Sequence, residues 1–209
     1  LAMTPVLEPT DAQEALEFTR LAFDLSEQFD TPVIVRSTTR LSHTRSLVQT
    51  GERLEVPCKG FREEPKKNVM IPGHARLRHG ALIERERALK EYLESSDLIR
   101  WERGGDELGI ITLSTAYTYV KELMPDASIL KLGVSYPLPD AKLREFCASV
   151  KRVIVVEELE PIIENELKIL GLKVEGKSLF PREGEFSTDV VREGLVQAQL
   201  LPPRAKIEA

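Results

Sequence analysis

The sequence has no long apolar run and no recognisable targeting segment. No stretch approaches the roughly twenty apolar residues that an α-helix needs to cross a bilayer. The first residues, LAMTPVLEP, have neither the basic start nor the apolar core of a signal peptide. We therefore expect a cytoplasmic protein with no membrane contact.

Cysteine is scarce as well, with Cys58 and Cys147 its two occurrences. The sequence has no CxxC motif, and no His or Cys follows either cysteine at metal-ligand spacing. Neither an iron–sulfur cluster nor a zinc site can therefore be built from this chain alone, and we expect reduced thiols. The motifs GxGxxG and GxxxxGK[ST] and any recognisable Ser/His/Asp or Cys/His arrangement are also missing. No dinucleotide site, P-loop or nucleophilic triad is predicted.

An excess of basic residues is missing too. The net charge is -5 and the isoelectric point is about 5.4, which argues against generic nucleic-acid binding. The sequence is 42% hydrophobic and 30% charged, a composition typical of a globular protein. Its 209 residues suffice for one substantial α/β core, or for one domain and part of another.

The N-terminal part predicts one helix followed by one strand. Apolar residues recur at helical spacing after the N-cap types Thr10 and Asp11, which predicts a helix over 11–29. The β-branched run TPVIVRSTT then predicts a short buried strand. Because a single αβ unit cannot bury both faces of its strand, we interpret this unit as the end of a domain that begins upstream.

Residues 40–72 carry mixed charge, Pro and Gly with little periodicity, which favours a linker. Helical spacing returns over 73–95, with Leu77, Leu89 and Leu93 on one side and dense Arg and Glu on the other. We expect a solvated helix packed along a surface.

The second half alternates strands and helices, which implies right-handed crossovers and a mostly parallel sheet covered on both faces. This pattern predicts one α/β domain over 97–200, a three-layer Rossmann-like sandwich. LIRWER and LGIITL flank GGDE, which favours a hairpin that joins an antiparallel edge strand to an inner strand. The expected strands are 108–113, 127–133 and 152–157, with 172–178 as a further candidate. The expected helices are 115–124, 139–150, 160–170 and 187–199.

The stretch VIVVEELEP, residues 153–161, runs from a buried strand into three carboxylates. Glu160 and Pro161 stand where a helix should begin, so capping suffices to explain Glu160. Glu157 and Glu158 project from the carboxyl end of a parallel strand, where ligands of open α/β sheets bind. We favour the structural interpretation and keep the functional one open.

Three other groups of polar residues are candidates for caps or ligand contacts. Ser114 and Thr115 follow a strand and precede a helix, which favours an N-cap before an anion-binding turn. The basic segment that runs from Lys66 to His79, with Arg76 and Arg78, could hold an anion or an acidic partner surface. A solvated basic helix start is the more common outcome. RLSHTR, with Arg40 and His43, follows a strand end and is a further candidate for ligand contact.

Six segments, in order along almost the whole chain, resemble the middle part of the α subunit of indolepyruvate ferredoxin oxidoreductase, a thiamine diphosphate dependent 2-oxoacid oxidoreductase. VEELEP and KLG-x-x-YPLP are the most specific pieces. The segments are EPTDAQEALEFTRLAFDLSEQFDTPVIVRSTTRLSHTRS, KKNVMIPGHARLRH, ELGIITLSTAYTYVKE, ASILKLGVSYPLPDAKLREF, VKRVIVVEELEPIIENELK and GKSLFPREGEFSTDVVREGL.

The resemblance implies four parts. Residues 1–45 would be the C-terminal end of a thiamine pyrimidine-binding domain, and 46–96 a linker with an amphipathic helix. Residues 97–200 would be a domain like the C-terminal domain of transketolase, and 201–209 a connection to a missing domain. The family oxidatively decarboxylates aryl pyruvates to aryl acetyl-CoA and passes electrons through iron–sulfur clusters to ferredoxin.

Against the family pattern, this chain is expected to be an inactive fragment with a scaffold role. The glutamate that activates thiamine would lie upstream, and the chain lacks the GDG and Asn that hold magnesium and diphosphate. No catalytic, cofactor-binding or metal-binding residue is therefore predicted here. Thiamine diphosphate, magnesium and 4Fe–4S clusters would belong to the full enzyme. The expected partners are the missing domains, a β subunit, ferredoxin and coenzyme A, in a dimeric assembly.

Within this scaffold the acidic and basic segments are the interface candidates. Arg40 and His43 are predicted to contact substrate, coenzyme A or a neighbouring subunit. The interface candidates are Arg76, Arg78, His79, Glu157, Glu158 and Glu160. Two alternatives stay open: a self-sufficient α/β anion-binding or assembly module, and a domain of a transketolase or a 2-oxoacid dehydrogenase β subunit.

Overall fold

A computed structural model describes residues 3–58 and 60–204. The helices are α1 (Ala12–Phe29), α2 (Thr39–His43), α3 (Pro65–Asn68), α4 (Pro72–Glu94), α5 (Ala116–Leu123), α6 (Asp140–Ala148), α7 (Ile162–Ile169) and α8 (Thr188–Gln197). The strands are β1 (Val6–Leu7), β2 (Ile34–Val35), β3 (Ile99–Glu102), β4 (Leu108–Leu113), β5 (Ser128–Leu132), β6 (Val134–Tyr136) and β7 (Arg152–Val156). No helix in these described ranges is long and apolar enough to span a membrane.

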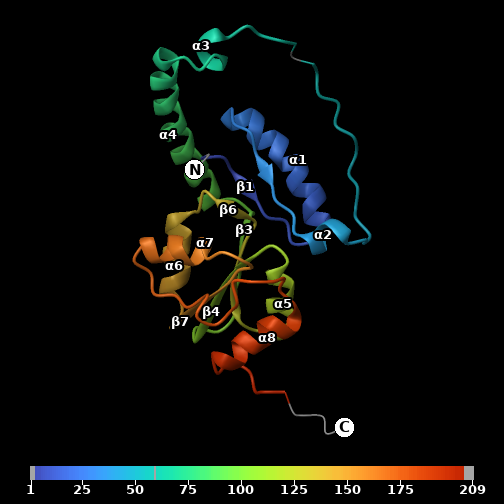
Figure 1. The fold of residues 1–209 in the computed structure, drawn as a ribbon. Helices are drawn as coiled ribbons and strands as arrows, with labels where there is room; N and C mark the ends of the chain where they lie inside the picture. Colours follow the sequence, from blue (N-terminus) through green and yellow to red (C-terminus); the bar gives the residue numbers. More distant parts are fainter. Residues whose placement is uncertain (1–2, 59, 205–209) are drawn as a thin grey trace.

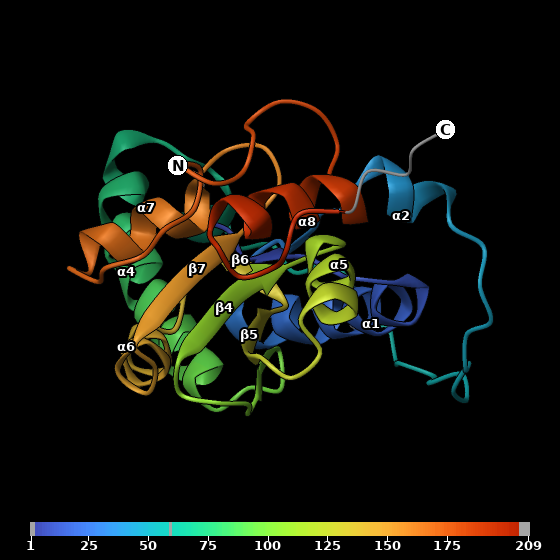
Figure 2. The ribbon, with the colours of Figure 1, turned by 90° about the horizontal axis from the view of Figure 1, so that it is seen from below.

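The larger sheet has four strands in the order β3-β5-β4-β7. β4 pairs in parallel with both β5 and β7, and β3 pairs antiparallel with β5 at the edge. α5 and α8 lie side by side and pack with Ile110, Ile129 and Ile154 on one face (Figure 2). The opposite face, which includes Ile111 and Leu130, packs with α6, α7 and the end of α4. The predicted three-layer, mostly parallel sandwich with an antiparallel edge strand is confirmed.

The predicted hairpin between the strand around 99 and the strand at 108–113 is wrong. β3 pairs with β5, with Trp101 opposite Leu130, and β4 lies on the other side of β5. Gly104 passes so close to the chain that a Cβ there would lie 2.3 Å from the carbonyl oxygen of Asp126. The loop after β3 therefore crosses the start of β5 before the chain enters β4. The possible strand at 172–178 is reduced to a bridge between Ile154 and Glu175.

The N-terminal αβ unit forms a second, small sheet with a strand from the other half of the chain. β1 pairs in parallel with β2 and antiparallel with β6, which follows β5 directly. α1 begins at its N-cap Asp11, whose carboxylate accepts a hydrogen bond from the backbone of Glu14 at 2.9 Å. The expectation of a buried strand here is wrong, because β2 has two residues at a sheet edge and Ile34 is 48% exposed.

A strap without regular structure in its described residues runs from 44 to 64 and leads into α3 (Figure 1). α4 then descends along the molecule, exposed over its first half and buried at Leu89 and Leu93 near its end. Leu77, predicted on the same side as these leucines, is 75% exposed because the body of the protein does not reach that turn. Of the predicted connection at 201–209, residues 205–209 lie outside the described residues.

Candidate functional site

The carboxyl ends of β4 and β7 meet at a cleft. In the sheet, β5 lies on one side of β4 and β7 lies on the other, so the chain changes direction across the sheet between β4 and β7. Open α/β sheets bind ligands at such a position. A cavity of about 160 Å³ lies there, lined from β4 by residues 113–116 and from β7 by residues 157–160. Glu8, Arg36 and Thr38 of the N-terminal unit close it. A second cavity of about 360 Å³ adjoins it and shares Arg36, Thr38 and Glu158.

Two residues with positive φ shape the turns of this cleft. Ser114, directly after β4, has φ 52°, and Leu159, after β7, has φ 61°. The hydroxyl of Ser114 donates to the carbonyl of Pro9 at 3.4 Å, so it links the cleft to the N-terminal unit. Thr115 is the N-cap residue of α5, but its side chain makes no capping hydrogen bond. The predicted side-chain N-cap at Ser114 and Thr115 is therefore wrong.

Glu157 supplies the cap that was predicted for Glu160. Its two carboxylate oxygens accept hydrogen bonds from the backbone N–H groups of Ile163 and Glu164 at 2.9 and 3.0 Å. Burial raises the pKa of Glu157, and these hydrogen bonds partly oppose that rise. Glu157 is 4% exposed, so its predicted role as a surface contact disagrees with the structure. The buried carboxylate that follows β7 therefore accepts hydrogen bonds from backbone N–H groups at the start of α7 that have no partner within the helix.

The other two carboxylates of VEELEP fasten the loop to residues 177–186. Glu158 accepts a hydrogen bond from the backbone of Phe186, and Glu160 pairs with Arg182 at the surface. The ammonium of Lys177 donates to the carbonyl of Glu157. Burial lowers the pKa of Lys177 although nearby carboxylates oppose that shift. Glu158 is half-buried and engaged with this chain, whereas Glu160 remains at the surface.

Glu8 is a buried carboxylate of the cleft that the sequence analysis missed. It is 2% exposed and accepts hydrogen bonds from Arg36 at 2.8 and 2.9 Å and from the hydroxyl of Ser135 at 2.9 Å. Burial raises the pKa of Glu8, and the guanidinium of Arg36 opposes the rise. These residues come from β1, the end of β2 and β6. No spacing in the sequence signals a contact among three such separate positions.

Arg40 and His43, both on α2, differ in their surroundings. Arg40 lines the second cavity with Glu158, and its Nε lies 3.4 Å from Glu185. His43 is exposed and does not line either cavity of the cleft. The structure therefore brings Arg40, but not His43, to the cleft.

The basic segment spans α3 and the first half of α4, away from the cleft (Figure 1). Arg78 is directed inward to Asp30 at the end of α1, at 3.4 Å. Arg76 and His79 are exposed. The structure therefore separates the basic interface candidates from the acidic ones within one chain.

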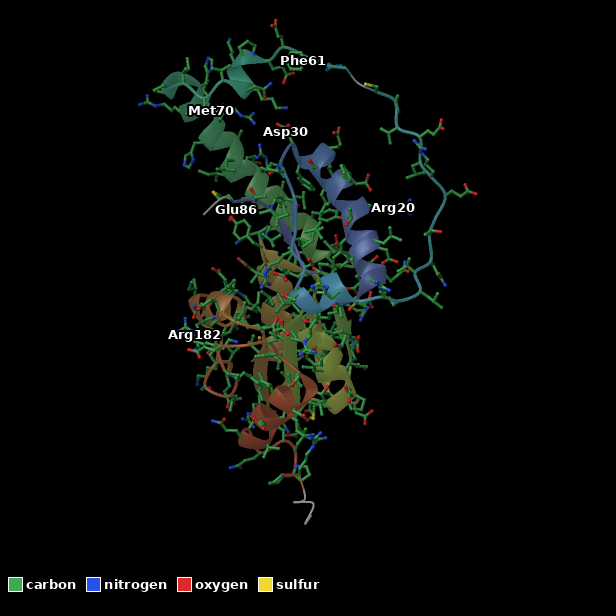
Figure 3. The ribbon with its side chains drawn as sticks, turned by 45° about the vertical axis from the view of Figure 1, so that its right-hand side comes forward. Arg20, Asp30, Phe61, Met70, Glu86 and Arg182 are labelled. Atoms are coloured by element: carbon green, nitrogen blue, oxygen red, sulfur yellow. The ribbon has the colours of Figure 1, made fainter. Side chains whose placement is uncertain are left out.

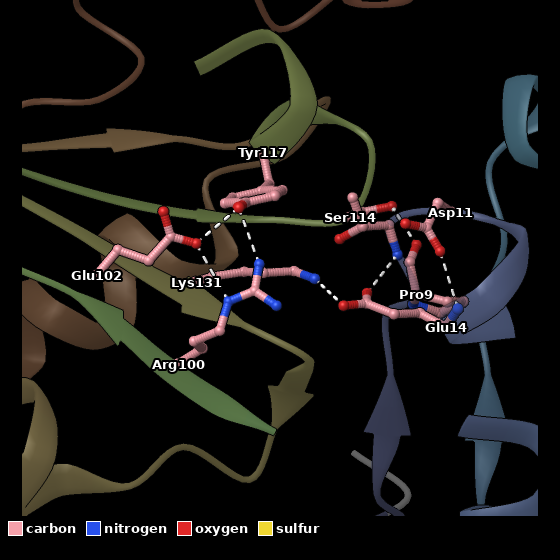
Figure 4. A network of polar contacts seen from close by, with 9 residues as sticks. Pro9, Asp11, Glu14, Arg100, Glu102, Ser114, Tyr117 and Lys131 are labelled. Carbon is pink, nitrogen blue, oxygen red and sulfur yellow. Dashed lines mark hydrogen bonds and ion pairs between the residues drawn. The ribbon is translucent and has the colours of Figure 1, made fainter. Parts of the chain in front are cut away.

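A second polar joint connects the same two parts of the molecule (Figure 4). Lys131, inside β5, pairs with Glu14 on α1, and its ammonium lies 4.8 Å from the centre of the Tyr117 ring. The Tyr117 hydroxyl donates to Glu102 at 2.6 Å and accepts from Arg100 at 2.8 Å. Burial lowers the pKa of Lys131, and Glu14 opposes the shift. A lone lysine in the apolar strand SILKL is the sequence signal that could have indicated this pair.

The polar contacts of the cleft hold parts of the chain in fixed positions. Glu8 and Glu157 are fully engaged with groups of this chain, and the Ser114 hydroxyl contacts a carbonyl, not a base. Among the described residues, no group of three or more His, Cys, Asp or Glu side chains could hold a metal ion. Neither joint presents a nucleophile next to a base. The geometry fastens the N-terminal unit to the larger sheet at two places.

Comparison with known proteins identifies relatives over nearly the whole chain. Indolepyruvate oxidoreductase subunit IorA of Methanothermobacter thermautotrophicus is 39% identical over 93% of this chain and 34% of its own length. The IorA subunits of Archaeoglobus fulgidus and Thermococcus kodakarensis are 35% and 38% identical over 99% and 90% of this chain. The chain spans about a third of the length of these relatives. No protein-family model matches it.

Two solved structures share the fold. The 2-oxoglutarate:ferredoxin oxidoreductase of Magnetococcus marinus superposes with a TM-score of 0.68 at 17% identity, over 95% of this chain and 42% of that one. A split-gene transketolase described as an inactive β4 tetramer gives a TM-score of 0.50 at 14% identity, over 94% of this chain and 56% of that one. The fold like the C-terminal domain of transketolase and the resemblance to the indolepyruvate oxidoreductase α subunit are confirmed.

Proposed function

We propose that this chain is the scaffold segment of a thiamine diphosphate dependent 2-oxoacid:ferredoxin oxidoreductase. It corresponds to about one third of the IorA subunit of indolepyruvate oxidoreductases. In this proposal the longer subunit oxidatively decarboxylates aryl pyruvates to aryl acetyl-CoA in the cytoplasm. The observation that carries the proposal is the identity of 35–39% to IorA subunits over 90–99% of the chain.

The two polar joints support a scaffold role. The Glu8–Arg36–Ser135 cluster and the Glu14–Lys131 pair both connect the N-terminal αβ unit to the half of the chain that holds the four-stranded sheet. A buried ion pair fixes relative geometry more than it adds net stability. Such joints would hold a neighbouring pyrimidine-binding domain in a defined orientation. Residues 1–45 are the proposed end of that domain, and 97–200 the proposed supporting domain.

The cofactors of the proposed enzyme are assigned to other parts of the subunit. The described residues contain no His, Cys, Asp and Glu group that fits magnesium or a 4Fe–4S cluster. We therefore assign no residue of this chain to thiamine diphosphate, magnesium or a cluster. A β subunit, ferredoxin and coenzyme A are the proposed partners of the assembled enzyme.

Arg40 is the residue of this chain that we propose meets substrate, coenzyme A or a neighbouring subunit. Its side chain is about half exposed at the second cavity, and its contact with Glu185 is long and solvated. Such exposed pairs contribute little to stability, so the guanidinium can exchange Glu185 for another anion. His43, three residues after Arg40 at the end of α2, is proposed as a contact outside the cavity.

The test compares this chain alone with the complete subunit assembled with its partner. We expect ferredoxin reduction by aryl pyruvate and coenzyme A in the assembly and none with the chain alone. Thiamine diphosphate with magnesium should not raise the melting temperature of the chain alone, whereas a ligand at a hundred times its Kd would stabilise by about 2.7 kcal/mol. Cofactor binding by the isolated chain, or an assembly inert toward 2-oxoacids, would refute the proposal.

The reading frame around the chain supplies an independent check. We expect a thiamine-activating glutamate upstream and cluster cysteines downstream. A downstream frame without cysteine clusters would favour a transketolase or a 2-oxoacid dehydrogenase over a ferredoxin-linked enzyme.

A further inference from the structure

A third cavity, of about 510 Å³, opens at the seam between the N-terminal unit and the four-stranded sheet. Its walls come from α1, the end of α4 and the turn after it, β3, and the chain in and after β5. Figure 3 shows α1, marked by Arg20, and α4, marked by Glu86, as both descend toward the sheet. None of its described lining residues also lines either cavity of the cleft. Its volume is typical of small-molecule sites.

Two cationic side chains line this cavity from paired strands. Arg100 of β3 lies directly opposite Lys131 of β5 in the antiparallel register, so both side chains leave the same face of the sheet (Figure 4). Like charges at such a cross-strand position repel each other and destabilise a sheet. Burial lowers the pKa of Lys131, and the positive charge of Arg100 adds to that shift. A cavity with two adjacent cations favours an anionic occupant.

Contacts within the chain use part of the hydrogen-bonding capacity of these cations. Lys131 is 3% exposed, and Glu14 is the hydrogen-bond acceptor of its ammonium among the described residues. Arg100 donates from its Nε to Glu102 at 3.1 Å and from one terminal nitrogen to Tyr117 at 2.8 Å. Both cations have further N–H donors, which can bond a carboxylate. Hydrogen bonds between ionised groups are the stronger ones.

Apolar side chains form another part of the wall. They are those of Phe18, Leu21, Tyr92 and Leu98, of which Phe18 and Leu98 are buried. Glu17 and Asp97 also line the cavity, but both are exposed, so water and salt screen their charge. The cavity therefore presents an apolar surface beside a pair of cations.

We propose that this cavity binds a monocarboxylate with an apolar chain, whose carboxylate bonds Arg100 and Lys131 and whose chain lies against Phe18 and Leu21. The anion relieves the repulsion between the two cations, and the apolar chain is removed from water. The ligand contacts α1, β3 and β5 together, so it stabilises the seam between them. This site goes beyond the proposed enzymatic activity and does not depend on it, because the proposed thiamine centre belongs to other parts of the subunit.

Isothermal titration calorimetry of the full chain with hexanoate tests the class of ligand. Hexanoate should bind saturably with one-to-one stoichiometry. Acetate lacks the apolar chain and hexanamide lacks the charge, so each should bind at least about tenfold more weakly. Norleucine adds an ammonium group to the same carbon chain and should also bind more weakly, because that group lies near the two cations. Equal binding of hexanamide, tighter binding of norleucine or no saturable binding of hexanoate would overturn the proposal.

Arg100→Gln should weaken hexanoate binding by about tenfold or more, because the carboxylate loses one of its two cationic partners. Arg103→Gln is the matched control. Arg103 is also exposed and directly follows β3, but its guanidinium lies 4.1 Å from the centre of the Trp101 ring and does not line the cavity. It should leave hexanoate binding unchanged, and circular dichroism reports whether each variant keeps the fold. Equal losses of affinity in the two variants would contradict the assigned site.

Asp97→Asn supplies a second test that does not depend on the folding of Arg100→Gln. Asp97 is exposed and lines the cavity, so this change removes a negative charge near the bound carboxylate. Hexanoate binding should become about twofold tighter, an effect of the size expected for an exposed charge. Weaker binding in Asp97→Asn, or an affinity that does not change in Arg100→Gln, would show that these charges do not hold the ligand and would overturn the proposal.

Discussion

Glu14 on α1 contacts the ammonium of Lys131 inside β5, across 117 positions of the sequence. The Lys131 side chain is 4% exposed and that of Glu14 is 15% exposed. The pair lies in the seam between the N-terminal unit and the four-stranded sheet. Removal of one charge would leave the other buried and without its ion-pair partner, and such a loss costs far more than the intact pair contributes.

Lys131→Met should therefore destabilise the protein by about 3 kcal/mol, whereas the double variant with Glu14→Gln should recover most of that loss. Urea unfolding of the wild type, both single variants and the double variant measures the coupling between the two side chains. Additive losses in the double variant would show that the two residues act independently.

Glu157→Ala should destabilise by about 2 kcal/mol, because two backbone N–H groups at the buried start of α7 lose their acceptor. Glu160→Ala is the control, since this carboxylate is exposed and its pair with Arg182 is solvated. It should change stability by less than about 0.5 kcal/mol. Thermal or urea unfolding compares the two, and equal losses would contradict the assignment of the cap to Glu157.

Gly104→Ala should destabilise by about 2 kcal/mol or more, because the new Cβ would overlap the backbone where the loop after β3 crosses β5. Gly105→Ala is the neighbouring control, since nothing lies within 4 Å of a Cβ at that position. Hydrogen exchange should show faster opening of β3 in Gly104→Ala only. Equal protection in the two variants would argue against this crossing.

The pH dependence of stability should change in Glu164→Gln. Burial favours the neutral form, but hydrogen bonds from Lys168 and from the backbone of Lys177 outweigh it and lower the pKa of Glu164 below 4.5. A carboxylate with a lowered folded-state pKa stabilises the protein above its unfolded pKa, and this contribution is lost as the pH falls through the folded value. The stability difference between wild type and Glu164→Gln should therefore shrink below pH 4.5. A constant difference in unfolding experiments down to pH 3 would contradict this.

The two thiols should differ in reactivity. Burial raises the pKa of Cys147 to about 11, so almost none of it is thiolate at pH 8, while Cys58 is exposed. Iodoacetamide should modify Cys58 in the native protein and Cys147 only after denaturation. Peptide mass spectrometry reads both sites, and rapid native labelling of Cys147 would show that its side chain is accessible.

Much of the fold could be predicted because its signals are local. The β-branched runs at 108–113 and 152–157 mark strands, and helical spacing with turn residues marks the helices between them. β4 and α5 occur within one or two residues of the predicted bounds. The alternation of strands and helices also predicted a mostly parallel sheet, because parallel strands are joined by crossover connections that usually contain a helix.

Less of the candidate site could be predicted from the sequence. VEELEP correctly indicated a polar strand end at the switch point, but which carboxylate caps α7 depends on where the turn directs each side chain. Leu159 adopts a left-handed conformation there, and Glu157, not Glu160, reaches the helix start. A sequence pattern names the polar residues of a turn but not their directions.

The sequence by itself determined the alternating elements, the layered architecture and the relationship to IorA subunits. The tertiary structure alone decided that β3 pairs with β5, that Glu8 meets Arg36 and Ser135, and that Glu14 meets Lys131. The reason is physical: local periodicity sets which residues face a core, whereas strand partners and buried charge pairs are selected by contacts between distant segments. A buried charge finds its partner only when the chain has folded around both.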